Sequence, residues 1–469
     1  MEKISSSNVT VKKIFSIAFP LIFQQLFMQL QIYVDRAMLG HVNSEYFSAI
    51  GNVLVPFNVL VSIIGGICTG TTIMIAQSIG AKNEVQCKNY AECSFIGNSI
   101  FPFITFLVFF FGSSSIFKLM GVQFPVLESS ASYLRIMSFI FIHMGFTSTA
   151  VCIMQGIGIT KIIMFTGVLN NLLNLILDYV LIFGKFGFPR MDINGAALAL
   201  VISDFLSYPI LVGYVFLSKK ITFKLSFKNV FHFSWKIYNK IFKVGFPSGI
   251  EFLIWNIGNL IIVSFLNRLD ILSVGIYTLV FSLSTFPLLL YMGFANAALT
   301  LAGQKTGEND HKQAINAGLM CLGFSFIFCI VFAALFIIFP KGILGLFTND
   351  MSYINYTAQF FLIVSITMFP KAINNVIGLG IRGIGDTKWM LYGQIFGTIF
   401  AITLSYIFIF IFKLGLFGIF IMFLIDESLR GLVNILRFLK GREFFFLKPF
   451  EKVVEKIENG DKGEGYSVL

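Results

Sequence analysis

Polar and acidic side chains inside long apolar runs are the residues of this 469-residue sequence that suggest chemistry. Asp35 lies near the end of one run, and Asn170, Asn174 and Asp178 lie in another at four-residue intervals. Residues four apart share one face of a helix, so the second set forms a polar stripe. A charge buried in a membrane helix costs about 2.5–3.5 kcal/mol and indicates function by default. Asp35, Asn174 and Asp178 together predict a binding site for a proton or Na⁺.

Two further charges, Glu251 and Lys371, lie in apolar runs of the second half of the chain. Each lies about three helical turns, or about 16 Å, from a base on the same side of the membrane, Lys240 or Arg382. Their similar depth predicts an ion pair between Glu251 and Lys371. Contact of either residue with a transported solute is the alternative.

The apolar runs are expected to be membrane-spanning helices, because 57% of the residues are hydrophobic and only 12% are charged. A soluble domain has about 45–50% apolar and about 25% charged residues, so a soluble enzyme or a nucleic-acid-binding protein is excluded. The runs are continuous, whereas strands of a membrane β-barrel alternate. Twelve spans are expected, at residues 14–34, 50–76, 92–112, 131–157, 162–184, 193–216, 241–266, 274–302, 314–338, 354–380, 390–412 and 416–438.

The sequence repeats itself at one nearly constant offset. KIFSIAFP at 13–20 matches KIFKVGFP at 240–247, AQSIGAKN matches GQKTGEND, and GIGITK at 156–161 matches GIGDTK at 383–388. Because each half carries six spans, both halves enter the membrane in the same direction, which predicts two six-helix bundles related by a parallel repeat. The expected parts are an N-lobe at 1–216, a cytoplasmic linker at 217–240, a C-lobe at 241–440 and a cytoplasmic polar tail at 441–469.

Some unusual residues occur in both halves. Pro20 and Pro247 correspond, and each lies early in the first helix of its lobe. Proline removes a backbone hydrogen bond and bends a helix, so the pair predicts hinges between two transport states, with packing adjustment as the alternative. Asp204 and Glu427 also correspond in the middle of their helices, and the sequence assigns them no role.

The acidic residues of the N-lobe have no such counterparts, since Ile262 aligns with Asp35 and Ser405 with Asp178. The alternative to an ion site is structural: hydrogen bonds between helices, or an ion pair of Asp35 with Arg36. A purely structural network would be expected in both lobes. The asymmetry therefore favours function.

The distribution of basic residues predicts how the chain lies in the membrane. Lys and Arg fall mainly in the loops on the side of the N-terminus, which places both termini in the cytoplasm of a multi-pass cell-membrane protein. The formal net charge of +11 then indicates anionic lipid headgroups as partners, and not nucleic acid.

Several segments resemble the multidrug and toxic compound extrusion (MATE) transporters: FPLIFQQLFMQLQIYVDRAMLGHV, AQSIGAKN, NLLNLILDYVLIFG and INGAALAL. The resemblance covers about residues 10–440. It implies twelve helices in two bundles, a V-shaped cavity, and export coupled to entry of Na⁺ or H⁺. Pro20, Asp35 and the pair Asn174 and Asp178 stand where the family has its N-lobe proline, its ion-coupling acid and an Asn-x-x-x-Asp pair.

The sequence departs from the family pattern at three positions. Leu200 stands where some members have a threonine of the N-lobe site. Glu251 lies about one turn before the acid of the NorM-type branch, and Lys371 replaces an aspartate of that branch. A fixed positive charge there argues against a second cation site, so the chain looks more like the DinF-type branch.

The expected function is a cation-coupled antiporter, driven by H⁺ or Na⁺, that exports cationic or amphipathic drugs by alternating access. No cofactor beyond the coupling ion is expected, and the protein is expected to be a monomer. The first alternative is a flippase for lipid-linked oligosaccharides in the same superfamily, for which Arg36, Arg135 and Lys371 would be the cationic residues. A remote alternative is an integral-membrane enzyme, although the four histidines lie on separate segments.

Overall fold

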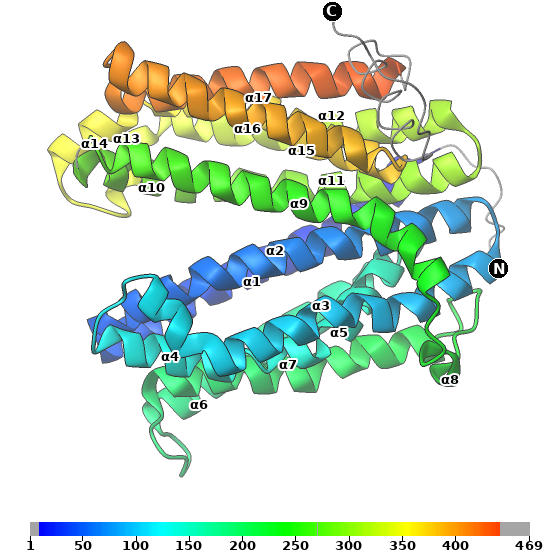
Figure 1. Cartoon of the computed structure of the whole chain (residues 1–469). Coiled ribbons are helices and arrows are strands. Elements are labelled where there is room, and N and C mark those ends of the chain that lie inside the picture. Colours follow the sequence, from blue (N-terminus) through cyan, green and yellow to red (C-terminus); the bar gives the residue numbers. More distant parts are fainter. Residues whose placement is uncertain (1–8, 270, 441–469) are drawn as a thin grey trace, which may run out of the picture.

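The computed structural model describes residues 9–269 and 271–440, and the regular structure in these residues is helical throughout (Figure 1). The expectation of an all-α fold is confirmed. The expected polar tail at 441–469 lies outside the described residues.

The first half of the chain contains α1 (Val11–Val42), α2 (Ser44–Gly80), α3 (Glu84–Leu119), α4 (Val126–Met137), α5 (Ile140–Ile157), α6 (Lys161–Phe183) and α7 (Asp192–Leu217). The short α8 (Phe227–Val230) lies between the halves. The second half contains α9 (Trp235–Leu266), α10 (Ile271–Leu283), α11 (Thr285–Gly307), α12 (His311–Ile338), α13 (Pro340–Gly345), α14 (Met351–Ala358), α15 (Phe361–Gly383), α16 (Thr387–Tyr406), a π-helical turn (Ile407–Ile411) and α17 (Gly415–Lys440).

Eleven helical segments of the described residues are long and apolar enough to cross a membrane. The twelfth expected span is α17, which has 26 residues but carries Asp426, Glu427 and Arg430 near its middle. Three expected spans are each built from two consecutive helices: α4 with α5, α10 with α11, and α14 with α15. Both prolines of the repeat lie inside continuous helices, Pro20 in α1 and Pro247 in α9.

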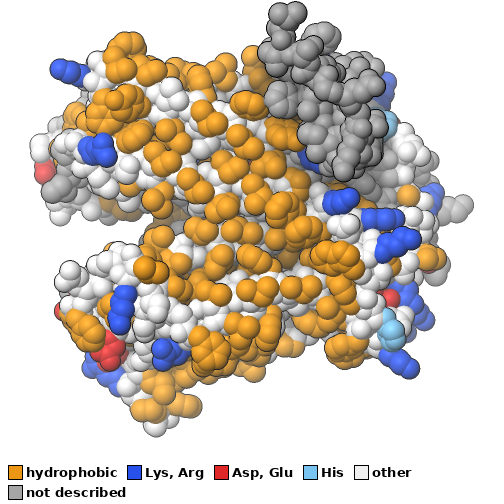
Figure 2. All heavy atoms as spheres, in the orientation of Figure 1, with side chains coloured by type: hydrophobic (Ala, Val, Ile, Leu, Met, Phe, Trp, Pro, Cys, Tyr) orange, Lys and Arg blue, Asp and Glu red, His pale blue; other side chains and the backbone are white. Residues whose placement is uncertain are grey.

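The helices form two bundles, α1–α7 and α9–α17 (Figure 1). Helices α2 and α9 pack against each other across the boundary, as do α1 and α2 against α11. Figure 2 shows the bundles separated by a hollow on the side away from the start of α1, and joined on the side where α1 begins. The molecule is therefore open between its halves at one end only.

The flanks of both bundles carry apolar side chains on their outer surface. Hydrophobic side chains cover the middle of the face in Figure 2, whereas Lys and Arg gather toward its two ends. Phe111, Phe165 and Leu260 are examples of large apolar side chains that are exposed in the isolated molecule. A continuous apolar belt of this kind is the surface that lipid tails cover in a membrane protein.

The closed end is held by contacts that repeat between the two halves; we call them the glutamine seam. Gln77 at the end of α2 donates from Nε2 to the carbonyl oxygen of Gly383 on α15, at 3.0 Å. Gln304 at the end of α11 donates in the same way to Gly156 of α5, at 2.9 Å. These four residues correspond to one another in the sequence repeat. The seam is thus built twice from one local pattern.

Two glycines of the same repeat allow the seam to close. A Cβ atom added to Gly80 would lie 1.8 Å from the carbonyl oxygen of Gln304. A Cβ atom added to Gly307 would lie 1.9 Å from that of Gln77. Small residues let helix backbones approach closely, so the glycines and the glutamines act together.

Candidate functional site

The predicted ion-site residues of the N-lobe come together where α1 packs against α6. Gln31, one turn before Asp35 on α1, donates from Nε2 to Asp35 Oδ2 at 3.4 Å, and its amide is in direct contact with that of Asn174. With its amide nitrogen directed at Asp178, Asn174 donates to Asp178 Oδ2 at 3.1 Å. The structure therefore brings Asp35, Asn174 and Asp178 into one cluster, with Gln31 as a fourth member.

No base whose side chain the structure describes compensates the negative charge of this N-lobe cluster. Asn174 and Asp178 are fully buried, and the Asp35 and Asp178 carboxyl groups lie within hydrogen-bonding distance of each other. One oxygen of each, Oδ1, is buried without a hydrogen-bond partner in the described part of the chain. Two carboxylates so close repel unless a proton or a cation lies between them. The cluster offers the oxygen atoms and the negative charge that a bound proton or cation requires.

The third member of the predicted stripe, Asn170, belongs to a different cluster. Its Nδ2 donates to Asp204 Oδ1 at 2.6 Å and to Ser207 Oγ at 3.0 Å, both on α7. Asp204 Oδ2 also lies 4.0 Å from Nε2 of His143. Residues eight apart differ by about 80° around a helix axis, so Asn170 and Asp178 face different neighbours. The single polar stripe is therefore divided between two clusters.

The predicted ion pair between Glu251 and Lys371 is not formed. Glu251 Oε1 instead lies 2.5 Å from Nη2 of Arg382, and both side chains are buried. Lys371 and Arg382 are about 16 Å apart along α15, so one carboxylate cannot reach both. A count of residues from Lys240 and Arg382 gives equal depths only if both bases lie at the membrane boundary. Lys240 instead lies inside α9, which begins at Trp235, and Arg382 is buried in the last turn of α15.

Lys371 lies in a cavity within the C-lobe. The cavity encloses about 980 Å³ when its open mouth is included. Six aromatic side chains line it: Trp255, Tyr277, Phe281, Tyr291, Phe420 and Phe423. The Nζ atom of Lys371 lies 5.6 Å from the centre of the Phe281 ring, and no ion pair joins it to any residue that the structure describes. A single ammonium group thus shares the cavity with six aromatic rings.

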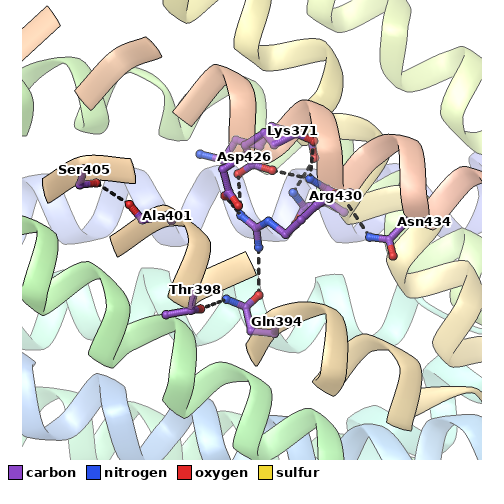
Figure 3. A network of polar contacts seen from close by, with 11 residues as sticks. Lys371, Gln394, Thr398, Ala401, Ser405, Asp426, Arg430 and Asn434 are labelled. Atoms are coloured by element: carbon purple, nitrogen blue, oxygen red, sulfur yellow. Dashed lines mark hydrogen bonds and ion pairs between the residues drawn. The ribbon is translucent and has the colours of Figure 1, made fainter. Parts of the chain in front are cut away.

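A network of charged and amide side chains lines one side of this cavity (Figure 3). On α17, Arg430 forms an ion pair with Asp426 and lies 3.7 Å from Glu427 Oε1. Arg430 Nη1 also donates to Gln394 of α16 at 3.1 Å. Asn374 of α15 donates to Glu427 Oε2 at 2.6 Å. The two acids of α17 are therefore held by neighbouring donors.

The sequence contains patterns that could have identified some of these partners. Gln31 lies four residues before Asp35, and Arg430 lies four residues after Asp426, which are spacings that bring side chains together on a helix. Arg382 follows no such pattern, because its partner Glu251 is on another helix. To predict a pair on two distant helices, one must know how these helices pack, and local spacing does not contain this information.

The described residues offer few side chains that could together bind a metal ion. No group of three or more His, Cys, Asp or Glu side chains converges in them as a metal site. The N-lobe cluster offers two carboxylates and the amide oxygens of its Gln and Asn members, and Leu200 adds no side-chain oxygen. Oxygen ligands of this kind suit a hard cation or a proton.

Comparison with known proteins agrees with this architecture. The MatE family model matches residues 20–180 and 247–407, two ranges separated by the same offset as the sequence repeat. "Uncharacterized transporter YisQ" of Bacillus subtilis is 26% identical, over 90% of this chain and 92% of its own. "Probable multidrug resistance protein NorM" of Thermotoga maritima is 28% identical, over 92% of each chain.

Solved structures share the fold. One described as an outward-facing conformation of a multidrug resistance MATE family transporter has a TM-score of 0.85 and 22% identity, over 92% of this chain and 95% of its own. A second, described as MATE in the bent conformation, has a TM-score of 0.82 and covers 95% of this chain and 97% of its own, also with 22% identity. The expectation of two repeated halves is confirmed, and the chain belongs to the MatE family of multi-pass membrane transporters and is not an enzyme.

Proposed function

We propose that the protein is a secondary antiporter that exports drug-like solutes in exchange for H⁺ or Na⁺ bound between Asp35 and Asp178. The observation that carries the proposal is the pair of facing carboxyl groups, each with a buried oxygen that no described donor satisfies. Na⁺ would be held by these carboxylates, and the amides of Asn174 and Gln31 would have to rotate to turn their oxygens toward it. A proton would be shared between the two carboxyl groups.

In the proposed orientation, the face with the glutamine seam is cytoplasmic and the hollow between the bundles opens to the outside of a cell membrane. The bases in the loops at the seam face support this orientation, because positive charge accumulates on the cytoplasmic side. Both termini are then cytoplasmic.

The two solutes are coupled because both act on the same helices. Asp35 is on α1 and Asp178 on α6, so an ion between them draws the two helices together. We propose that α1 adjusts at Pro20, with Pro247 as its counterpart in α9, and that this lowers the affinity for the exported solute. Two ligands that prefer different states of one protein are coupled by thermodynamic linkage.

The exported solutes are proposed to be cationic or amphipathic drugs. Relatives from Thermotoga maritima and Bacillus cereus carry the name "Probable multidrug resistance protein NorM", which supports this class of solute. The abundance of aromatic side chains supports it too, since apolar contact and cation–π attraction bind many different drugs.

Proteoliposomes test the proposal directly. Ethidium movement is measured with a pH gradient or a Na⁺ gradient imposed separately, using the full chain and the variant Asp35→Asn. Transport driven by one gradient and lost in the variant is the expected result, and the effective gradient names the ion. Asp350→Asn is the matched control, because this exposed residue caps α14 and asparagine caps a helix equally well.

Folded protein that moves ethidium under neither gradient would overturn the proposal and favour the lipid-linked oligosaccharide flippase. Undiminished transport by Asp35→Asn would retain an antiporter but remove the N-lobe pair as its coupling site.

A further inference from the structure

The C-lobe cavity takes no part in the proposed ion coupling, yet it holds a charged group whose environment is unusual. We propose that this cavity binds an aromatic solute that carries a carboxylate, with Lys371 as the partner of the carboxylate and the ring-lined wall as the partner of the aromatic body. The inference concerns the amphipathic solutes of the proposed exporter and not its cationic ones, and in that sense rests on the proposed function.

Lys371 carries a charge that no described residue pairs with. Two carboxylates line the same cavity, but Asp426 is paired with Arg430, and Glu427 accepts from Asn374 and lies near Arg430. Neither comes within ion-pair distance of Lys371 Nζ. A charge taken out of water is costly unless it is paired, so the Lys371 ammonium favours an anionic partner in the cavity.

Aromatic rings form part of the wall of this cavity. The ammonium lies over the Phe281 ring, and a cation–π contact contributes only about 0.5–2 kcal/mol. The remaining rings come from several helices, among them Trp255 on α9, Tyr291 on α11 and Phe423 on α17. Aromatic groups pack favourably by offset stacking or edge-to-face contact, so the wall favours a flat, aromatic solute.

The balance of charge in the cavity also favours a carboxylate. The single unpaired base matches one carboxylate, whereas a doubly charged pyrophosphate would require further bases. An organic cation would meet the positive charge of Lys371 while the nearby acids are already paired.

Three probes with one fluorophore separate charge from shape: dansylglycine, its uncharged methyl ester, and dansylcholine, which is cationic. Binding is measured on the purified full chain in lipid nanodiscs, without any gradient, by energy transfer from tryptophan to the dansyl group. Trp255 lines the cavity, so Trp255→Phe is expected to lower the transfer. Trp235→Phe is the matched control, because this exposed residue begins the same helix.

Dansylglycine is expected to bind at least about tenfold more tightly than its ester, because a charge-assisted hydrogen bond is lost in the ester. Lys371→Gln is expected to remove this preference while leaving the affinity for the ester unchanged. Lys371→Arg is expected to restore it, which shows that the effect is one of charge and not of folding.

Three results would overturn the inference: equal affinity for acid and ester, an unchanged preference in Lys371→Gln, or tightest binding of dansylcholine. Displacement of dansylglycine by phosphatidylglycerol, but not by a free aromatic acid, would also overturn it, since the lysine would then bind a lipid headgroup. Dansylglycine binding is measured without a gradient and ethidium movement with one, so a failure of this site and a failure of ion coupling give different results.

Discussion

The polar cluster of the N-lobe and that of the C-lobe differ in how their charges are balanced. Between α1 and α6, Asp35 and Asp178 face each other with amides as their only described hydrogen-bonding neighbours. Around the C-lobe cavity, Asp426 is paired with Arg430, and Glu427 lies 3.7 Å from the same guanidinium and accepts a hydrogen bond from Asn374. An uncompensated pair of acids favours uptake of a positive ion, whereas a balanced set holds helices together without one. Charge balance, more than the presence of buried charges, separates a proposed coupling site from a scaffold.

The largest expected effect tests whether the N-lobe acids act as one unit. Asp35→Asn, Asp178→Asn and the double variant are each expected to reduce gradient-driven efflux by at least about tenfold, because either change removes the shared ion. The double variant is expected to be no worse than the single ones, since residues that act together are not additive. Efflux rates in proteoliposomes give the comparison. A reduction in the double variant equal to the product of the two single reductions would show that Asp35 and Asp178 act as independent sites.

The second prediction concerns the stability of the C-lobe network. Arg430→Gln is expected to destabilise the protein by about 3–5 kcal/mol, because it leaves buried acids uncompensated. Asp35→Asn is expected to leave stability unchanged or to raise it, since it relieves repulsion. Melting temperatures in one detergent measure both. Arg430→Lys is the control that keeps the charge, and equal melting of Arg430→Gln and the unaltered protein would contradict the contrast.

The third prediction concerns the seam that joins the two lobes. Gly80→Ala is expected to cost about 1–3 kcal/mol, as is usual for overpacking, because the new methyl group meets the backbone of Gln304. Faster hydrogen exchange at residues 76–83 and 303–310 would report the opened seam. Gly51→Ala lies on the same helix with no atom near its added Cβ, so it should leave exchange at these residues unchanged. Identical exchange in both variants would refute the role of the close contact.

The smallest expected effect concerns the neutral part of the Asn170 cluster. Ser207→Ala removes one hydrogen bond from Asn170, which retains its bond to Asp204. The expected loss of stability is about 1 kcal/mol, the usual net contribution of such a bond, and efflux should be unchanged. Thermal melting and the ethidium assay measure the two quantities. A loss of transport as large as that of Asp35→Asn would show that the two N-lobe clusters act as one functional site.

The spans and the repeat could be predicted from the sequence because both depend on composition and local pattern. A run of apolar residues has few alternatives to a membrane helix, and matched segments keep their spacing regardless of packing. The predicted residues Asp35, Asn174 and Asp178 do meet in space, although their role stays a prediction.

The pairing of buried charges could not be predicted in the same way. Flanking bases give the depth of a buried charge only if Arg382 marks the membrane boundary, but this side chain is buried against Glu251. Spacing alone places Asn170 and Asp178 on one stripe, whereas the helix turns far enough over eight residues to offer them different neighbours. The helix that packs against a given residue is determined by the packing of the whole bundle.

The glutamine seam has a consequence for how a chain of this design arises. Gln77 reaches Gly383 while Gln304 reaches Gly156, so residue and partner exchange roles between the halves. Such reciprocity is the mark of an isologous contact, the kind that two identical subunits make around a twofold axis. A half-length ancestor carrying one Gln and one Gly of this pattern would form both bonds with a second copy of itself, as a parallel homodimer that later gene fusion made permanent.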